Sequence, residues 1–167
     1  HHSYYLDSVG SNIPVTRMAF RRSPGFCDCT VLTAPSTNTW TIDHNLETDP
    51  QWTIVKNMDQ SQPWYIFYKV GSDNKVLQWD NHNQDWIDTS NYSTGAVTTS
   101  ATQITLPMAP LSAGNRYMIW YFATQPGVCK VGKYTGTGSQ QTIDCGFTTG
   151  ARFVMITEVG SGQDYWR

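Results

Sequence analysis

Hydrophobic and polar residues alternate over short runs along the chain, and small polar turns separate these runs. Alternation with a period of two is typical of β-strands that bury one face. The pattern predicts strands at residues 15–20, 27–32, 40–43, 52–55, 63–70, 75–79, 96–106, 116–123 and 129–134. Helical spacing with caps is nowhere convincing. About ten short strands joined by turns predict an all-β fold, an antiparallel β-sandwich of the jelly-roll or lectin-like kind.

One motif occurs twice in the chain. Residues 24–25, a Pro-Gly turn signal, recur at 126–127, and the Thr-Ile-Asp triplet at 41–43 recurs at 142–144. A one-residue deletion between the two motifs keeps them aligned. A period near one hundred residues is too long for a solenoid and suits an array of small domains. The chain therefore contains about one and a half copies of a repeat.

This repeat divides the chain into three parts. Residues 1–12 begin with His1 and His2 rather than Met, and we interpret them as a tag remnant and an N-terminal arm. We expect residues 13–167 to form the β-sandwich from a full repeat at about 24–123, the first repeat, and a partial copy at 126–167, the second repeat. Residues 15–20 also align with the closing strand at 116–123. They therefore indicate an earlier repeat, and the chain is interpreted as a piece of an array.

Charge excludes some classes of function. Eleven Lys and Arg against thirteen Asp and Glu give a net charge of −2, which provides no basic field for nucleic acid and no polybasic patch for membranes. No apolar run reaches the roughly 18 residues that a membrane-spanning helix needs. We therefore expect neither nucleic-acid binding nor membrane insertion. Charged residues make up 14% of the chain and aromatic residues 13%, a balance that suits a β-rich displayed protein.

The four cysteines leave several interpretations open. Cys27 and Cys29 share one face of a predicted strand, but no second pair or nearby His completes a zinc site with them. We favour reduced cysteines that pack as small hydrophobic residues, and we expect no metal or other cofactor. A disulfide between the two repeats, which would join Cys27 or Cys29 to Cys129 or Cys145, stays open, because sequence cannot establish such a pair.

The sequence contains only weak indications of a catalytic site. Asp43 and Asp144 recur in both repeats and could be a carboxylate pair for glycoside hydrolysis. A recurring Asp before a turn more often accepts hydrogen bonds from turn amides, and we favour that role. His44 and His82 have no recognisable nucleophile beside them, so we expect surface or turn roles for them. The sequence therefore predicts that the protein is not an enzyme.

Carbohydrate binding is the better-supported chemistry. Sugars present apolar C–H faces and many hydroxyl groups, so their sites combine aromatic platforms with amide and carboxylate groups. Residues 80–95 form a long polar stretch that is expected to be an exposed loop, and residues 78–92 have this composition. The candidate sugar-binding residues are Gln78, Trp79, Asp80, Asn81, Asp85, Trp86 and Tyr92. The alternative is that Trp79 and Trp86 are core residues that shield a sheet.

An ordered series of motifs lies at residues 20–26, 32–34, 41–46 and 52–57, and its elements return after residue 117. This series resembles a repeat domain of uncharacterised function in phage tail-fibre-like proteins, over about residues 13–167. The family has no catalytic residues to carry over. The second repeat replaces His44-Asn45 with Cys145-Gly146, so a role that needs the His-Asn pair is not shared by both repeats.

The resemblance implies a phage virion protein at the tail or capsid surface. We expect a tail-fibre or spike domain that mediates host attachment by binding surface carbohydrate. Its partners would be other virion subunits and a host glycan, and it would assemble as a homo-oligomer, a trimer. One alternative is a capsid or tail decoration protein that packs only on neighbouring subunits. The alternative of another class is a polysaccharide-degrading glycoside hydrolase.

Overall fold

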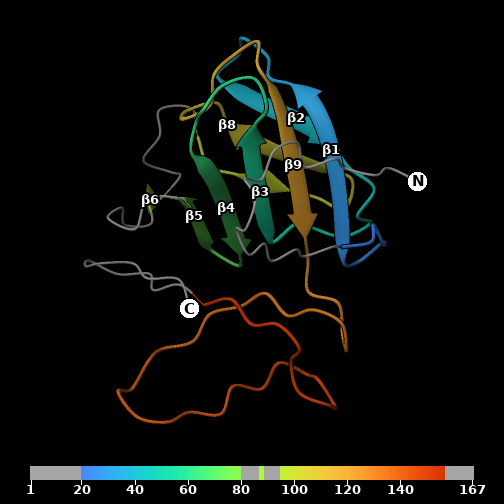
Figure 1. The fold of residues 1–167 in the computed structure, drawn as a ribbon, viewed down its shortest axis with the longest axis vertical. Helices are drawn as coiled ribbons and strands as arrows, with labels where there is room; N and C mark the ends of the chain where they lie inside the picture. Colours follow the sequence, from blue (N-terminus) through green and yellow to red (C-terminus); the bar gives the residue numbers. More distant parts are fainter. Residues whose placement is uncertain (1–19, 80–86, 89–94, 157–167) are drawn as a thin grey trace, which may run out of the picture.

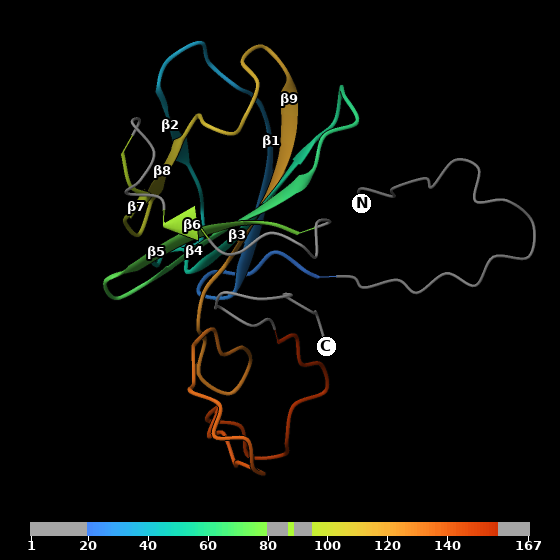
Figure 2. The same ribbon diagram turned by 90° about the vertical axis from the view of Figure 1, so that its left-hand side faces the viewer.

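The structure is a computed structural model that describes residues 20–79, 87–88 and 95–156, and these residues contain strands and turns but no helix. The strands are β1 (Cys27–Thr33), β2 (Thr39–Asp43), β3 (Trp52–Asn57), β4 (Trp64–Val70), β5 (Asp73–Gln78), β6 (Ile87–Asp88), β7 (Thr98–Thr99), β8 (Gln103–Pro107) and β9 (Arg116–Phe122). Six strands form one sheet in the order β1-β9-β3-β4-β5-β6, and three form a second in the order β2-β8-β7. Every pairing is antiparallel. The two sheets form two layers (Figure 1, Figure 2), which confirms the predicted antiparallel β-sandwich.

Most strands lie where alternation predicts them. The predicted segments 27–32, 40–43, 52–55, 63–70, 75–79 and 116–123 correspond to β1, β2, β3, β4, β5 and β9. Burial along β2 alternates as the pattern requires, with Trp40 and Ile42 buried between exposed residues. Alternation predicts these strands because each one covers a core on one side.

Within the sandwich, two predicted segments differ from the structure. Residues 96–106 form a hairpin of β7 and β8 rather than one strand, with Thr98 opposite Thr105. Its turn has neither Gly nor Pro; instead the Ser100 hydroxyl accepts a hydrogen bond of 3.0 Å from the Gln103 amide. The stretch 80–95, expected to be a loop, contains β6, which pairs with β5. Short strands closed by side-chain hydrogen bonds are invisible to a periodicity argument.

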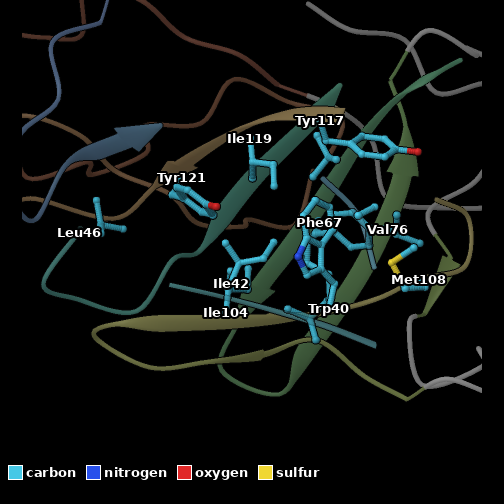
Figure 3. Packing of buried hydrophobic residues seen from close by; sticks show 14 of the residues in the cluster. Trp40, Ile42, Leu46, Phe67, Val76, Ile104, Met108, Tyr117, Ile119 and Tyr121 are labelled. Carbon is cyan, nitrogen blue, oxygen red and sulfur yellow. The ribbon is translucent and has the colours of Figure 1, made fainter. Parts of the chain in front are cut away.

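The core lies between the two sheets (Figure 3). The inward side chains of the six-stranded sheet include Val55, Phe67, Val76, Tyr117, Ile119 and Tyr121, and those of the smaller sheet include Trp40, Ile42, Ile104 and Leu106. Each fully buried aliphatic or aromatic side chain contributes roughly 1.5–3 kcal/mol from the removal of apolar surface from water. Packing of both inward faces therefore stabilises the sandwich.

Within the larger sheet, strand β9 is paired with a neighbouring strand along each of its two edges. Cys27 of β1 and Trp52 of β3 both lie opposite Phe122, at the end of β9. The strands β1 and β3 are joined to each other only through β9 in the sheet order. Because β9 already pairs on both edges, a further strand that follows it in the chain cannot add to it.

This arrangement explains why the described residues of the second repeat, 126–156, contain no strand. The predicted strand at 129–134 is wrong for this structure. The corresponding strand of the first repeat, β1, pairs with β9, and neither edge of β9 is free. Residues 126–156 lie outside the sandwich in both views (Figure 1, Figure 2). The predicted strand at 15–20 falls outside the described residues except for Phe20, and the division into repeats stays a prediction.

Candidate functional site

The structure describes two of the seven predicted sugar-binding residues. Gln78 is the last residue of β5, and Trp79 follows it. Asp80, Asn81, Asp85, Trp86 and Tyr92 lie outside the described residues, so their grouping with Gln78 stays a prediction. The position of Trp79 locates the candidate site at the end of β5, on the outer face of the six-stranded sheet.

Trp79 belongs to a row of three tryptophans on this outer face, which we call the aromatic row. Its ring contacts Trp64 edge to face, with centroids 5.7 Å apart and an interplanar angle of 85°. Trp64 in turn stacks on Trp120, at 5.8 Å and 10°. All three side chains are partly buried. The row therefore presents ring surface to solvent while its lower parts pack on the sheet.

Strand periodicity places these rings together. Trp64 begins β4 and lies opposite Lys56 of β3, whereas Trp120 of β9 lies opposite Ile54 of β3. Lys56 and Ile54 are two residues apart and point to the same face, so Trp64 and Trp120 lie on a diagonal across β3. Sequence reasoning did not select Trp64 or Trp120. The alternation within 63–70 and 116–123 assigns each a face, but only the strand order brings them together.

Polar groups border one end of the aromatic row. The Lys56 ammonium lies 5.7 Å from the centroid of the Trp64 ring and donates a hydrogen bond of 2.5 Å to the Gln62 carbonyl. A cation over an indole face is favourable, by roughly 0.5–1 kcal/mol at an exposed site. On the same face, the Arg116 guanidinium donates to the Asp59 carboxylate at 3.0 and 2.6 Å.

A hydrogen-bonded network holds this border in place. The Gln62 side chain accepts from the Asn57 amide at 2.8 Å and from the Tyr117 hydroxyl at 3.1 Å, and it donates to the Ser112 hydroxyl at 2.7 Å. The buried Asn57 also donates to the Tyr117 oxygen at 3.1 Å. Because Gln62 is fixed through its side chain, its carbonyl holds the Lys56 ammonium beside Trp64.

Buried apolar residues form the floor of the outer face: Cys27, Ile54, Ile66 and Phe122. Cys27 and Cys29 lie on this face, as their spacing predicts, and all four cysteines carry free thiols. Burial, with smaller effects from Cys29 and Asp28, raises the pKa of Cys27 to about 12. Cys27 therefore stays protonated at neutral pH. Among the described residues, no cluster of His, Cys, Asp or Glu could hold a metal ion.

The two recurring aspartates have local structural partners. Asp43 accepts a hydrogen bond of 2.8 Å from the Gln103 side chain, and Asp144 accepts one of 2.8 Å from the amide of Gly146. The second contact is the turn-amide role that we favoured for both aspartates. Asp43, in contrast, accepts from a residue of the neighbouring strand β8 rather than from its own turn.

His44 is buried, with 4% of its surface exposed, so a surface role for it is wrong. Its backbone amide bonds to Thr102, and its ring lies 5.3 Å from the Tyr121 ring. Burial lowers the pKa of the imidazole, although the Gln103 and Ser100 backbones act the other way. His44 is therefore a neutral turn residue that packs on the core. His82 lies outside the described residues.

Asp28 is a buried carboxylate that sequence reasoning missed. It accepts backbone hydrogen bonds of 2.8 Å from Cys29 and 2.8 Å from Asn45, and it forms an ion pair with Arg22. Burial opposes its ionisation, but these hydrogen bonds and Arg22 outweigh burial and lower its pKa. Asp28 joins the start of β1 to the turn after β2. A lone Asp in a predicted strand carries no signal of this role.

A pocket of about 420 Å³ lies elsewhere, at the far end of β4 from Trp64. Its lining includes Asp49, Gln51, Lys69, Gly71 and Thr99. Thr99 donates a hydrogen bond of 3.3 Å to Asp49, and the Gln51 side chain accepts one of 2.7 Å from the Thr124 amide. These polar groups are already engaged with one another and with the backbone. The pocket has no aromatic ring in its lining, so it lacks the platform that a sugar site needs.

Fold and site together define an antiparallel β-sandwich with a tryptophan row on the outer face of its larger sheet. No helix in the described residues is long and apolar enough to cross a membrane. A family model described as a domain of unknown function, DUF7483, matches residues 13–167, and the chain belongs to this family. No curated protein and no solved structure matches the chain.

Proposed function

We propose that this domain binds carbohydrate through the aromatic row and the polar groups beside it. The observation that carries the proposal is the contact geometry of three partly buried rings on one face, in which Trp64 contacts both Trp79 and Trp120. Rings that are fixed at their base lose little entropy when a sugar stacks on them. Lys56 lies beside the Trp64 ring as a hydrogen-bonding group for hydroxyls. Gln78 lies opposite Tyr65, which packs on the core between the sheets, so Gln78 is on the other face from the rings.

The biological setting in this proposal is a phage tail fibre or spike that attaches to a host surface glycan. It rests on the resemblance of the motif series to that of phage tail-fibre-like proteins, together with the carbohydrate chemistry of the aromatic row. Such attachment benefits from several copies of a weak site, because linked sites raise the overall avidity without new contacts. A trimeric virion assembly would supply those copies.

The test is a glycan-array screen followed by titration with the best ligand. Trp64→Ala removes the ring that touches both of its neighbours, and we expect affinity to fall about tenfold or more. Trp86→Ala tests whether the residues that follow Trp79 in the chain contribute. Tyr134→Ala is the control, because this aromatic residue is 50% exposed and lies outside the sandwich. Near-ultraviolet circular dichroism verifies that each variant is folded.

The outcomes separate the candidates. Loss of binding in Trp64→Ala with retention in Tyr134→Ala supports the aromatic row as the site. No glycan bound by folded wild type contradicts the proposal. In that case the decoration protein becomes the leading candidate, since an aromatic face with partly buried rings also suits burial against a neighbouring subunit. Sedimentation of the wild-type chain then measures the assembly directly.

A further inference from the structure

Strand β1 lies at the edge of the six-stranded sheet (Figure 1). It pairs with β9 along one side, and within the described residues no strand pairs with its other side. The end of β1 is open to solvent: Val31 is 48% exposed, Leu32 is 38% exposed, and Thr33 is exposed as well. A sheet edge presents N–H and C=O groups with which another extended chain can pair.

Hydrogen bonds at the two ends of the β1–β9 ladder show which residues of β1 face the open side. The Ala34 amide donates to the Asn115 carbonyl at 2.9 Å, and the Ala123 amide donates to the Phe26 carbonyl at 3.1 Å. In an antiparallel ladder, residues that exchange bonds with the partner strand alternate with residues whose groups point away from it. The even-numbered residues of β1 therefore bond to β9, and its odd-numbered residues point their amides and carbonyls to the open side.

Few of the amides on the open side are available to a partner. The amides of Cys27 and Cys29 already have acceptors within the chain, at 3.0 and 2.8 Å. The next odd-numbered residue after β1 is Pro35, which has no amide. Among the described residues of this edge, Val31 and Thr33 are therefore the ones that offer both an amide and a carbonyl to another strand.

The sequence around these two residues carries no charge. Residues 29–36 contain no Asp, Glu, Lys or Arg. Proteins often protect a sheet edge with a charged side chain that opposes pairing. The open side of β2, the edge strand of the smaller sheet, includes the charged Asp43 in this way. The exposed end of β1 has no such protection, which favours pairing with a further strand.

One register of two antiparallel β1 strands satisfies all the available groups. With a twofold axis at Leu32, Val31 of each copy lies opposite Thr33 of the other, and each opposed pair exchanges both of its backbone hydrogen bonds. An axis at Val31 would place Thr33 opposite Cys29, whose amide already has an acceptor. An axis at Thr33 would place Val31 opposite Pro35, which has no amide. The available groups therefore select the axis at Leu32.

The same register brings compatible side chains together. The two Leu32 side chains meet at the axis, in a pair that is not hydrogen-bonded, where opposed side chains lie closest. Val31 meets Thr33. Asp28 lies opposite Ser36, and its carboxylate is already held by partners in its own chain. Because no like charges are opposed between residues 28 and 36, β1 is complementary to a second copy of itself.

We propose that the domain associates with a second copy of itself through β1, in a twofold contact that joins the two six-stranded sheets into one continuous sheet. Such a contact closes with two copies, so a trimeric assembly would use a different surface. A twofold axis between antiparallel strands is perpendicular to the sheet, which places the outer faces of both copies on the same side. Under the proposed function, on which this consequence alone rests, both aromatic rows would face one glycan surface.

Sedimentation equilibrium of the full chain tests the contact. For wild type we expect the mass to approach twice that of the 18.8 kDa chain as concentration rises. Val31→Pro removes an available amide and leaves the β9 ladder intact, at a position where an edge strand tolerates proline. We expect this variant to raise the dimer dissociation constant about tenfold or more.

The matched control is Thr41→Pro. Thr41 is an exposed residue of the edge strand β2, and its amide points away from β8, because the even-numbered residues on either side of β2 bond to that strand. This variant should leave the dimer dissociation constant unchanged. Far-ultraviolet circular dichroism verifies that both proline variants are folded.

Crosslinking tests the register without proline. In Leu32→Cys the new thiols of two copies lie directly opposite each other at the axis, within reach of a disulfide. In the control Thr33→Cys the new thiols occupy diagonal positions, which are too far apart to be joined. After mild oxidation we expect about tenfold more disulfide-linked dimer in the first variant. Wild type measures the background from the native cysteines, and peptide mass spectrometry identifies the joined residues.

Several results would overturn the proposal. A wild-type chain that stays monomeric at about 500 µM does not form the contact at any useful affinity. A dimer that a folded Val31→Pro variant leaves unchanged forms through another surface. Equal crosslinking in Leu32→Cys and Thr33→Cys contradicts the register, and this measurement decides alone if Val31→Pro does not fold. Neither experiment involves a glycan, so the contact and the proposed carbohydrate binding can fail independently.

Discussion

The first and second repeats share a set of motifs but differ in structure. In the residues that the structure describes, the first repeat forms nine strands in two packed sheets, whereas the second, at residues 126–156, has a turn and no strand. Both contain the same Pro-Gly turn with the same hydrogen bonds. The turn, whose hydrogen bonds are local, thus forms in both repeats. The strands, which need partners far apart in the chain, form only in the first.

This difference shows which interactions make the fold. A turn closes within five residues and needs only Pro and Gly at the right positions. Strand β1 needs β9, which lies about ninety residues further along the chain, and closure of such a loop carries an entropy cost that only packing can offset. An alternating pattern is necessary for a strand such as β1, but the presence of a strand to pair with, such as β9, decides whether it forms.

The largest contrast is expected between equivalent isoleucines. Ile42→Ala should destabilise the sandwich by about 2–5 kcal/mol, because Ile42 is 1% exposed and its removal leaves a cavity. Ile143→Ala should change the unfolding of the sandwich by less than about 0.5 kcal/mol, since Ile143 is 46% exposed and outside it. Urea denaturation followed by tryptophan fluorescence measures both. Equal losses would show that the second repeat shares the core of the first.

A smaller difference in stability is expected between variants of Asp28 and of Lys130, the residue at the matching position of the second repeat. Asp28→Asn should cost about 2–3 kcal/mol, as the charged acceptor of two backbone amides is lost. Lys130→Gln should be close to neutral for the sandwich. The measurement is again the free energy of unfolding in urea at pH 7.

The Asp28 contrast also predicts a pH dependence. The pKa of Asp28 is lower in the folded state than in the unfolded chain, so its contribution is complete above about pH 4 and is lost as pH falls through the native pKa. Wild type should therefore lose more stability than Asp28→Asn between about pH 5 and pH 2. Parallel acid dependences of the two proteins would show that Asp28 is not the coupled group.

The two turn glycines are expected to give the smallest contrast. Gly25→Ala forces a non-glycine residue into a φ of 76° and requires Gln125 to move, so we expect a loss of about 1–2 kcal/mol. Gly127→Ala has the same strain at a φ of 73°, but no atom lies within 4 Å of the added methyl. Its effect on the sandwich should be close to zero. Thermal unfolding by circular dichroism compares the two, and a large loss for Gly127→Ala would mean that the second turn supports the sandwich.

The sequence by itself determined the strand class, most strand positions and both Pro-Gly turns. These features depend on a period of two and on residues with restricted φ, which act over a few positions. It also indicated aromatic chemistry near Trp79. It could not indicate Asp28 as a buried carboxylate, because its partners Asn45 and Arg22 lie on other segments.

Only the tertiary structure decided the sheet order, and with it the candidate site. Trp64, Trp79 and Trp120 are in one row because β4 lies between β3 and β5 while β9 lies beyond β3. The same order places β9 between β1 and β3, so neither of its edges is free to pair with residues 126–156. The physical reason is that ladder pairing joins segments far apart in the chain, and the alternation of each segment is equally compatible with many neighbours.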